Sequence, residues 1–175
     1  MAQEGTKGER EEMRGNNNRA QGLLFALLII TLMSVAACRQ RPVYSEIQQV
    51  AGTEWSRFNR LIFKADISDT ISAYDIHITL RTNADYPYRN IFLFVTTTSP
   101  EGYSVKDTLE YYLADEKGNW FGSGLGDVND LSVNYRSNVI FPYTGTYEFR
   151  IDQGMRTDNL RGVMDVGLRI VPRGK

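Results

Sequence analysis

The stretch YDIHITLR, from Tyr74 to Arg81, alternates apolar and polar side chains at every position. This two-residue period matches a β-strand, in which successive side chains point to opposite faces, and it does not match the 3.6-residue period of a helix. One face of such a strand is apolar and the other is polar. We therefore predict a strand that covers a core on one side and meets solvent on the other.

The same alternation recurs in four other segments, which are residues 61–67, 108–113, 147–152 and 164–171. Residues 91–95 are apolar without interruption, which predicts a central strand covered on both faces. Clusters of turn-forming residues separate these segments, at 83–85, 99–102, 115–119 and 142–145. Only residues 46–60 are compatible with a short helix. Several short strands divided by turns predict an all-β fold, an antiparallel β-sandwich of jelly-roll or immunoglobulin-like type.

The composition excludes several classes of function. The chain has 175 residues and a net charge of -1, which gives no electrostatic footprint for binding nucleic acid. A single cysteine cannot form an internal disulfide, and a single histidine cannot build a cluster of histidine metal ligands. We expect no cofactor and no metal.

The N-terminal part of the chain has the layout of a secretory signal. Residues 22–37 form an uncharged apolar run, GLLFALLIITLMSVAA, preceded by Arg14 and Arg19. A basic region, an apolar region and small residues at the end are typical of a signal peptide. A membrane-spanning helix is the alternative, although it needs about 20 apolar residues. We interpret residues 1–37 as a cleaved signal peptide. The acidic residues near the N-terminus favour Met13 as the true start.

The end of the apolar run, Val35-Ala36-Ala37-Cys38, resembles a bacterial lipobox, with Val35 where leucine is usual. The resemblance implies that the sulfur of Cys38 takes a diacylglyceryl group, that the chain is cut before it, and that the new amine is acylated, for example with palmitate. Several acyl chains anchor a protein stably, where one gives marginal binding. We expect residues 38–45 to be the lipidated N-terminus and tether, and residues 46–175 to form the sandwich. A cysteine buried in a membrane helix is the alternative.

No catalytic site stands out. His77 shares the polar face of its strand with Asp75, and a carboxylate beside a histidine is one arrangement of a general base. A solvent-facing polar row explains the same pattern, and no nucleophile motif of the G-x-S-x-G type is present. We therefore predict that the protein is not an enzyme.

Oxygen donors gather at Asp127, Asn129 and Asp130. A calcium-binding EF-hand loop beginning at Asp127 would need glycine at its sixth position and glutamate at its twelfth. Ser132 and Asn138 stand there instead, so the cluster is a weak candidate for calcium.

Four aromatic residues are candidates for a binding surface. Trp120 and Phe121 precede a glycine-rich stretch, which lacks the spacing of nucleotide-binding loops. Tyr86 and Tyr88 join two predicted strands. Aromatic rings at a surface can stack on sugars. The alternative is that these residues fill the edge of the core, since tyrosine often packs with its hydroxyl at the wet edge.

Short segments along the mature chain, taken together and in order, resemble the GldH family of gliding-motility lipoproteins of Bacteroidota. These segments are VYSE (43–46), Asp69-Thr70 with YDI (74–76), YPYRNIFLF (86–94), DTLEYYLAD (107–115) with Gly118 and Trp120, GSGLGD (122–127), FPYTGTYEF (141–149), QGMR (153–156) and DVGLR (165–169).

The resemblance implies a non-enzymatic cell-envelope lipoprotein required for the gliding machinery, as an assembly or stabilising component. Its expected partners are the lipid bilayer, through acylated Cys38, and other envelope proteins of that machinery. A glycan-binding envelope lipoprotein using the aromatic residues is the alternative. Because Arg39-Gln40-Arg41 lacks the acidic cluster that resembles a surface-export signal, we expect the periplasmic leaflet of the outer membrane. Asp69-Thr70-Ile71 resembles the O-glycosylation motif of Bacteroidota, which makes Thr70 a candidate glycosylation site.

Overall fold

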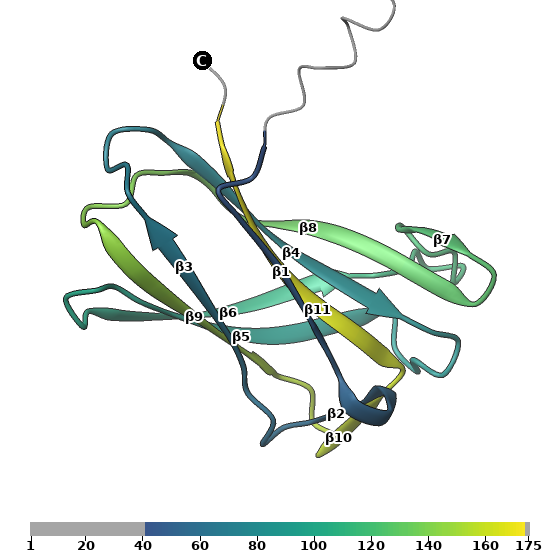
Figure 1. Cartoon of the computed structure of the whole chain (residues 1–175). Helices are drawn as coiled ribbons and strands as arrows, with labels where there is room; N and C mark the ends of the chain where they lie inside the picture. Colours follow the sequence, from purple (N-terminus) through teal and green to yellow (C-terminus); the bar gives the residue numbers. More distant parts are fainter. Residues whose placement is uncertain (1–40, 174–175) are drawn as a thin grey trace, which may run out of the picture. The chain divides into compact units, whose positions relative to one another are not determined.

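The computed structural model describes residues 41–173 (Figure 1). The predicted signal peptide, Met13 and Cys38 lie outside the described residues. Within residues 41–173, no helix has the length and apolar character needed to cross a membrane.

The described chain folds into two larger antiparallel sheets and one short strand pair. The first sheet has the order β1 (Tyr44–Gln49), β11 (Val163–Pro172), β4 (Tyr74–Thr82), β8 (Val128–Val139) and β7 (Ser123–Leu125). The second has the order β3 (Leu61–Ile67), β9 (Gly145–Gln153), β5 (Asn90–Thr98) and β6 (Ser104–Tyr112), and β2 (Glu54–Ser56) pairs with β10 (Asn159–Arg161). The predicted all-β antiparallel fold is confirmed.

The core lies between the two sheets and is built by the alternation seen in the sequence. Every second residue of β3 and β4 is buried, beginning with Leu61 and Tyr74 respectively. The buried residues of both sheets form one hydrophobic cluster, which includes Phe63, Ile78 and Phe149, each with 0 % of its surface exposed. Removing this apolar surface from water is the main free energy that holds the sheets together.

The prediction that β5 is covered on both faces is wrong. Ile91, Leu93 and Val95 are fully buried, but Phe92 and Phe94 between them are only half-buried. β5 is flanked by β9 and β6 in its own sheet, and only one of its faces turns toward the other sheet. On the outer face the Lys106 amine lies 4.5 Å from the centroid of the Phe94 ring.

Residues 46–60, the segment compatible with a short helix, are mostly extended. Most of that segment is occupied by β1, a single 3-10 turn at Ala51–Thr53, and β2. β1 pairs with β11 along its whole length, and these hydrogen bonds override local helix propensity. Trp55 in β2 is fully buried, and its indole N–H donates to the carbonyl oxygen of Asn59 at 2.9 Å.

The last strand has a register that the alternation alone did not predict. An irregularity between Val163 and Asp165 in the pairing of β11 with β4 shifts the strand. Val163 and Asp165 are therefore buried, and Met164, expected inside, is half-buried. β-bulges of this kind redirect side chains locally.

Candidate functional site

Three connections and both ends of the described chain gather at one end of the sandwich, which we call the entry end. In the first sheet, three residue pairs bring four strand ends together. Tyr44–Ile170 aligns the start of β1 with the end of β11, and Tyr74 pairs with both Pro172 of β11 and Val139 at the end of β8. In the second sheet, Ile67 pairs with Gly145 and Thr98 with Ser104. The entry end thus includes connections 68–73, 99–103 and 140–144, on the left of Figure 1.

Phe141 joins the two sheets at the entry end. Its ring centroid lies 5.5 Å from that of Tyr74 in the first sheet and 4.7 Å from that of Tyr147 in the second. The Tyr147 hydroxyl accepts a hydrogen bond from the Tyr143 backbone N–H at 3.1 Å, which fixes the connection. Gly145 follows with φ of 123°, and a Cβ there would lie 3.1 Å from the Pro100 side chain. This position therefore favours glycine.

These residues form one wall of an apolar groove at the entry end. The groove has a volume of about 500 Å³, and both sheets line it, through Ile76 and Val139 of the first and Thr97 and Phe149 of the second. At its mouth the rings of Tyr103 and Tyr143 stack, with centroids 6.3 Å apart and an angle of 18° between their planes. Mostly apolar concavities with a few polar groups are the usual form of a binding site.

A charged pair links the two sheets beside the groove. Arg136 of β8, which lines the groove, donates to the Asp107 carboxylate of β6 at 2.7 Å, and the Tyr135 hydroxyl donates to the same oxygen at 2.6 Å. Burial alone would raise the pKa of Asp107, but the hydrogen bonds from Tyr135 and Arg136 outweigh it and hold that pKa below its ordinary value. The carboxylate therefore stays ionised and paired, which suits a structural clamp better than a proton acceptor.

The structure brings together three of the four predicted aromatic residues, at the end opposite the groove. The Tyr86 ring lies 6.1 Å from both the Tyr88 and the Trp120 rings, in edge-to-face arrangements. Trp120 is half-buried, Tyr88 is 41 % exposed, and Phe121 is 58 % exposed on the following loop.

Tyr86 itself requires a correction, because only 5 % of it is exposed. Its hydroxyl donates to the Asn90 carbonyl at 2.8 Å, and burial raises its pKa. It supports the cluster from inside and presents no face to a ligand. Tyr88 also borders a groove of about 560 Å³ that is completed by Phe92, Gly154, Met155 and Arg156.

Comparison with known proteins identifies the family. The family model described as "GldH lipoprotein" matches residues 42–170, which is almost all of the described sandwich. This chain belongs to the GldH lipoprotein family. It is 35 % identical to the "Gliding motility lipoprotein GldH homolog" of Christiangramia forsetii, over 82 % of this chain and 92 % of that protein. It is 30 % identical to "Gliding motility lipoprotein GldH" of Flavobacterium johnsoniae, over 82 % of this chain and 93 % of that protein.

Among solved structures, the chain matches the VP2 subviral particle of infectious bursal disease virus with a TM-score of 0.35 and 12 % identity. The match covers 75 % of this chain and about a third, 33 %, of the viral protein. At this TM-score the likeness bears on neither the fold nor the function of the GldH-family chain.

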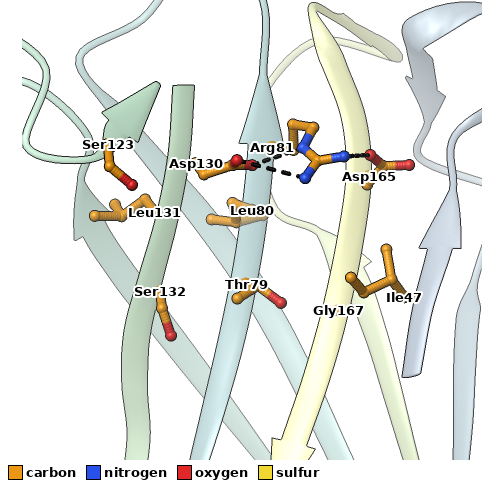
Figure 2. A pocket seen from close by; sticks show the side chains of 10 residues that line it. All are labelled: Ile47, Thr79, Leu80, Arg81, Ser123, Asp130, Leu131, Ser132, Asp165 and Gly167. Carbon is orange, nitrogen blue, oxygen red and sulfur yellow. Dashed lines mark hydrogen bonds and ion pairs between the residues drawn. The ribbon is translucent and has the colours of Figure 1, made fainter. Parts of the chain in front are cut away.

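This GldH-family chain has a further hollow on the outer face of its first sheet, where Arg81 lies between two carboxylates (Figure 2). The Arg81 Nε donates to Asp130 at 2.6 Å, and Nη1 donates to Asp165 at 3.1 Å. Because these residues are far apart in sequence, no local motif could predict the network. Asp130 was considered above as a calcium ligand, but its carboxylate is engaged by Arg81.

The other predicted residues lie on exposed or half-buried surface. His77 is half-buried on β4, and the described residues provide no hydrogen bond between it and Asp75. Asp75 instead accepts the Asn138 backbone N–H at 2.9 Å and lies 3.8 Å from Arg173. Thr70 is half-buried in the connection between β3 and β4, beside Asp69.

The connection that holds Thr70 is closed by the Asp69 carboxylate. This carboxylate accepts the backbone N–H groups of Ile71 at 2.8 Å and Ser72 at 3.1 Å. Hydrogen bonds from the Ser72 side chain, and then from these N–H groups, lower the pKa of Asp69 to about 2. The carboxylate is therefore ionised at neutral pH, the form that accepts these hydrogen bonds.

Proposed function

We propose that this GldH-family chain is a non-enzymatic lipoprotein of the gliding machinery, anchored through acylated Cys38 and assembling or stabilising that machinery by protein contacts. The observation that carries the proposal is the family match over residues 42–170, which begins four residues after Cys38. Both curated relatives are named as gliding motility lipoproteins. Residues 1–37 are then the cleaved signal peptide. The lipidated tether, expected to be residues 38–45, ends sooner, because the Val43 backbone N–H already donates to the Ile170 carbonyl and β1 begins at Tyr44.

A non-enzymatic role is supported by the way the polar groups are engaged. Asp107 is paired with Arg136, Asp75 is held by the Asn138 backbone, and Arg81 bridges Asp130 and Asp165. Groups held in such pairs are poorly placed to transfer protons. The test is complementation of a deletion strain: His77→Ala should restore spreading motility fully, and failure of that variant at normal abundance would favour an enzyme.

The anchor is tested by substituting the cysteine. Cys38→Ser should lose incorporation of labelled palmitate and should no longer sediment with membranes. The variant should keep its folded core, since the described sandwich begins after this position. Labelled lipid that still incorporates into Cys38→Ser would place the acylation elsewhere.

The periplasmic leaflet of the outer membrane is the proposed location, supported by Arg39-Gln40-Arg41 after the cysteine, which lacks the acidic cluster of a surface-export signal. Protease added to intact cells should leave the protein whole and should degrade it after the outer membrane is opened. Removal of the protein from intact cells would indicate the outer surface instead.

Binding of a glycan is the second candidate function, favoured by the groove beside Tyr88. The Tyr88 and Trp120 rings both pack against Tyr86, which gathers the three aromatic residues at this end. A glycan array probed with the lipoprotein distinguishes the two functions. A sugar signal that Tyr88→Ala removes and Tyr112→Ala keeps would support the glycan function. Copurification of gliding-machinery proteins without any sugar signal would support the assembly role.

We also propose that Thr70 carries an O-glycan. The support is its place in an Asp-Thr-Ile sequence on a surface connection. The mass of the mature protein should fall by the mass of a glycan in Thr70→Ala. The control is Thr108→Ala, in which the glycan should remain, because Asp107-Thr108-Leu109 has the same form as Asp69-Thr70-Ile71 but lies within strand β6. An unchanged mass in Thr70→Ala would remove the site.

A further inference from the structure

Large apolar side chains protrude from all three connections of the entry end. Ile71 of connection 68–73 is 88 % exposed, Tyr103 of connection 99–103 is 69 % exposed, and Ile140 of connection 140–144 is 57 % exposed. Single exposed apolar residues are common on soluble proteins, but apolar residues gathered on one surface mark a contact site. The entry end is therefore a candidate contact surface.

The length of the tether determines what this surface can reach. The backbone N–H of Val43 donates to the Ile170 carbonyl at 2.9 Å, so the chain is held by the sandwich from Val43 onward. Cys38 precedes Val43 by five residues, which span at most about 18 Å even when fully extended. The nine residues of β4 alone extend about 30 Å. A tether shorter than the sandwich keeps the entry end, and not the opposite end, next to the membrane that holds the acyl chains.

The chemistry of the entry end suits a lipid surface. Tyrosine is enriched at membrane interfaces, where its ring is apolar and its hydroxyl meets water, and the stacked Tyr103 and Tyr143 have this character. Arg41 and Arg173 are exposed at the same end of the sandwich and can attract anionic headgroups, although Arg173 also lies 3.8 Å from Asp75. Of the acidic residues here, Glu101 is exposed, whereas the carboxylate of Asp69 is turned into its own connection and that of Asp75 accepts the Asn138 backbone N–H.

We propose that the entry end lies on the lipid leaflet that holds acylated Cys38, with Ile71, Ile140 and Tyr103 in its headgroup region. The inference rests on the lipid anchor of the proposed function. In addition to the covalent anchor, the domain then has a second, non-covalent contact with the membrane, which orients it. The partner of the entry end in this contact is lipid.

The experiment uses the full-length lipoprotein, processed in cells and reconstituted into vesicles of phosphatidylcholine and phosphatidylglycerol. Because Cys38 is the only cysteine and its thiol carries lipid, an introduced cysteine is the only free thiol. Ile71→Cys and Ile140→Cys receive an environment-sensitive fluorophore. Phe58→Cys and Phe121→Cys are matched controls, because these side chains are 82 % and 58 % exposed but lie at the opposite end.

Vesicles that contain spin-labelled phosphatidylcholine then quench only the probes in contact with lipid. Probes at residues 71 and 140 should lose about half of their emission or more, as expected for side chains that enter the headgroup region, and probes at residues 58 and 121 should keep theirs. Equal quenching at all four positions, or none at 71 and 140, would overturn the proposal. Soluble iodide, which quenches probes that face water, gives a further test. If the probes at residues 71 and 140 are quenched neither by the spin-labelled lipid nor by iodide, a protein covers this surface and the proposal is overturned.

The wild-type chain separates failure of this proposal from failure of the anchor. When the anchor is present, the wild-type chain takes no thiol label and floats with the vesicles. A wild-type chain that is labelled at Cys38 and stays in solution would remove the anchor and this contact together. Flotation without quenching at residues 71 and 140 would remove the contact alone.

Discussion

Replacing Phe141 with alanine should remove the contact between the two sheets at the entry end and lower the free energy of unfolding. Phe141 is 3 % exposed, and its ring contacts Tyr74 of one sheet and Tyr147 of the other. Phenylalanine-to-alanine changes in cores cost about 3–5 kcal/mol, because apolar surface is lost and a cavity remains. A domain of this size has a free energy of unfolding of about 5–15 kcal/mol, so Phe141→Ala should lose a large part of it.

The assay is urea unfolding of the Cys38→Ser chain without its signal peptide, followed by tryptophan fluorescence from the buried Trp55 and the half-buried Trp120. A loss of this size moves the midpoint by about 2 M urea. Phe121→Ala is the matched control, since its side chain is 58 % exposed and its change should stay within about 0.5 kcal/mol. If Phe141→Ala lowers the free energy of unfolding no more than Phe121→Ala does, Phe141 does not hold the two sheets together.

Other predictions follow from particular contacts. The pKa values of Asp107 and Asp69 are lowered in the folded state, so their stabilising effect is complete above the unfolded value of about 4 and is lost as the pH falls below it. The unfolding midpoint should therefore drop between about pH 4 and pH 2. Asp107→Asn should flatten that drop, and an unchanged profile would contradict the assigned pairing. Gly167→Ala places a Cβ 2.3 Å from the Thr79 hydroxyl oxygen and should destabilise the domain by about 1–3 kcal/mol. Adding Thr79→Ala should recover part of this loss in thermal unfolding, and the absence of any recovery would show that the clash lies elsewhere. Arg81→Ala leaves the buried Asp165 carboxylate without its arginine partner and should lower the unfolding midpoint more than Arg57→Ala, whose partner Asp158 is exposed.

The sequence predicted the strands whose two faces differ strongly in polarity. β3 and β4 begin at Leu61 and Tyr74, as the alternation indicates, because burial on one face and exposure on the other impose that pattern. β8 was missed, although residues 131–136, LSVNYR, alternate apolar and polar side chains in the same way. Its membership of the sheet depends on pairing with β4, and only Tyr135 on its inner face is buried. The polar ends of β8 carry no such pattern, so its full length is set by the pairing with β4.

The candidate sites divide in the same way. The aromatic residues Tyr86, Tyr88 and Trp120 were singled out by type, and they do meet, but the burial of Tyr86 depends on packing that residue type cannot reveal. The entry-end groove was missed altogether. Its wall comes from residues such as Thr97, Tyr103 and Phe141, which only the alignment of the two sheets brings to one place. Ile140 and Phe141, two large apolar residues just before the turn predicted at 142–145, were the available signal.

The two ends of the domain have different tasks if the entry end rests on lipid. The short tether and the exposed Ile71 and Ile140 then occupy the membrane side, and the opposite end stands about 30 Å away from the headgroups. That end carries Tyr88, Phe121 and Phe58, all substantially exposed. Proteins of the gliding machinery, or a glycan, must approach this end or the sheet faces, because lipid covers the other. Substitutions at Tyr88 and Phe121 should therefore weaken partner capture and leave membrane association intact, whereas substitutions at Ile71 and Ile140 should change the orientation of the domain first.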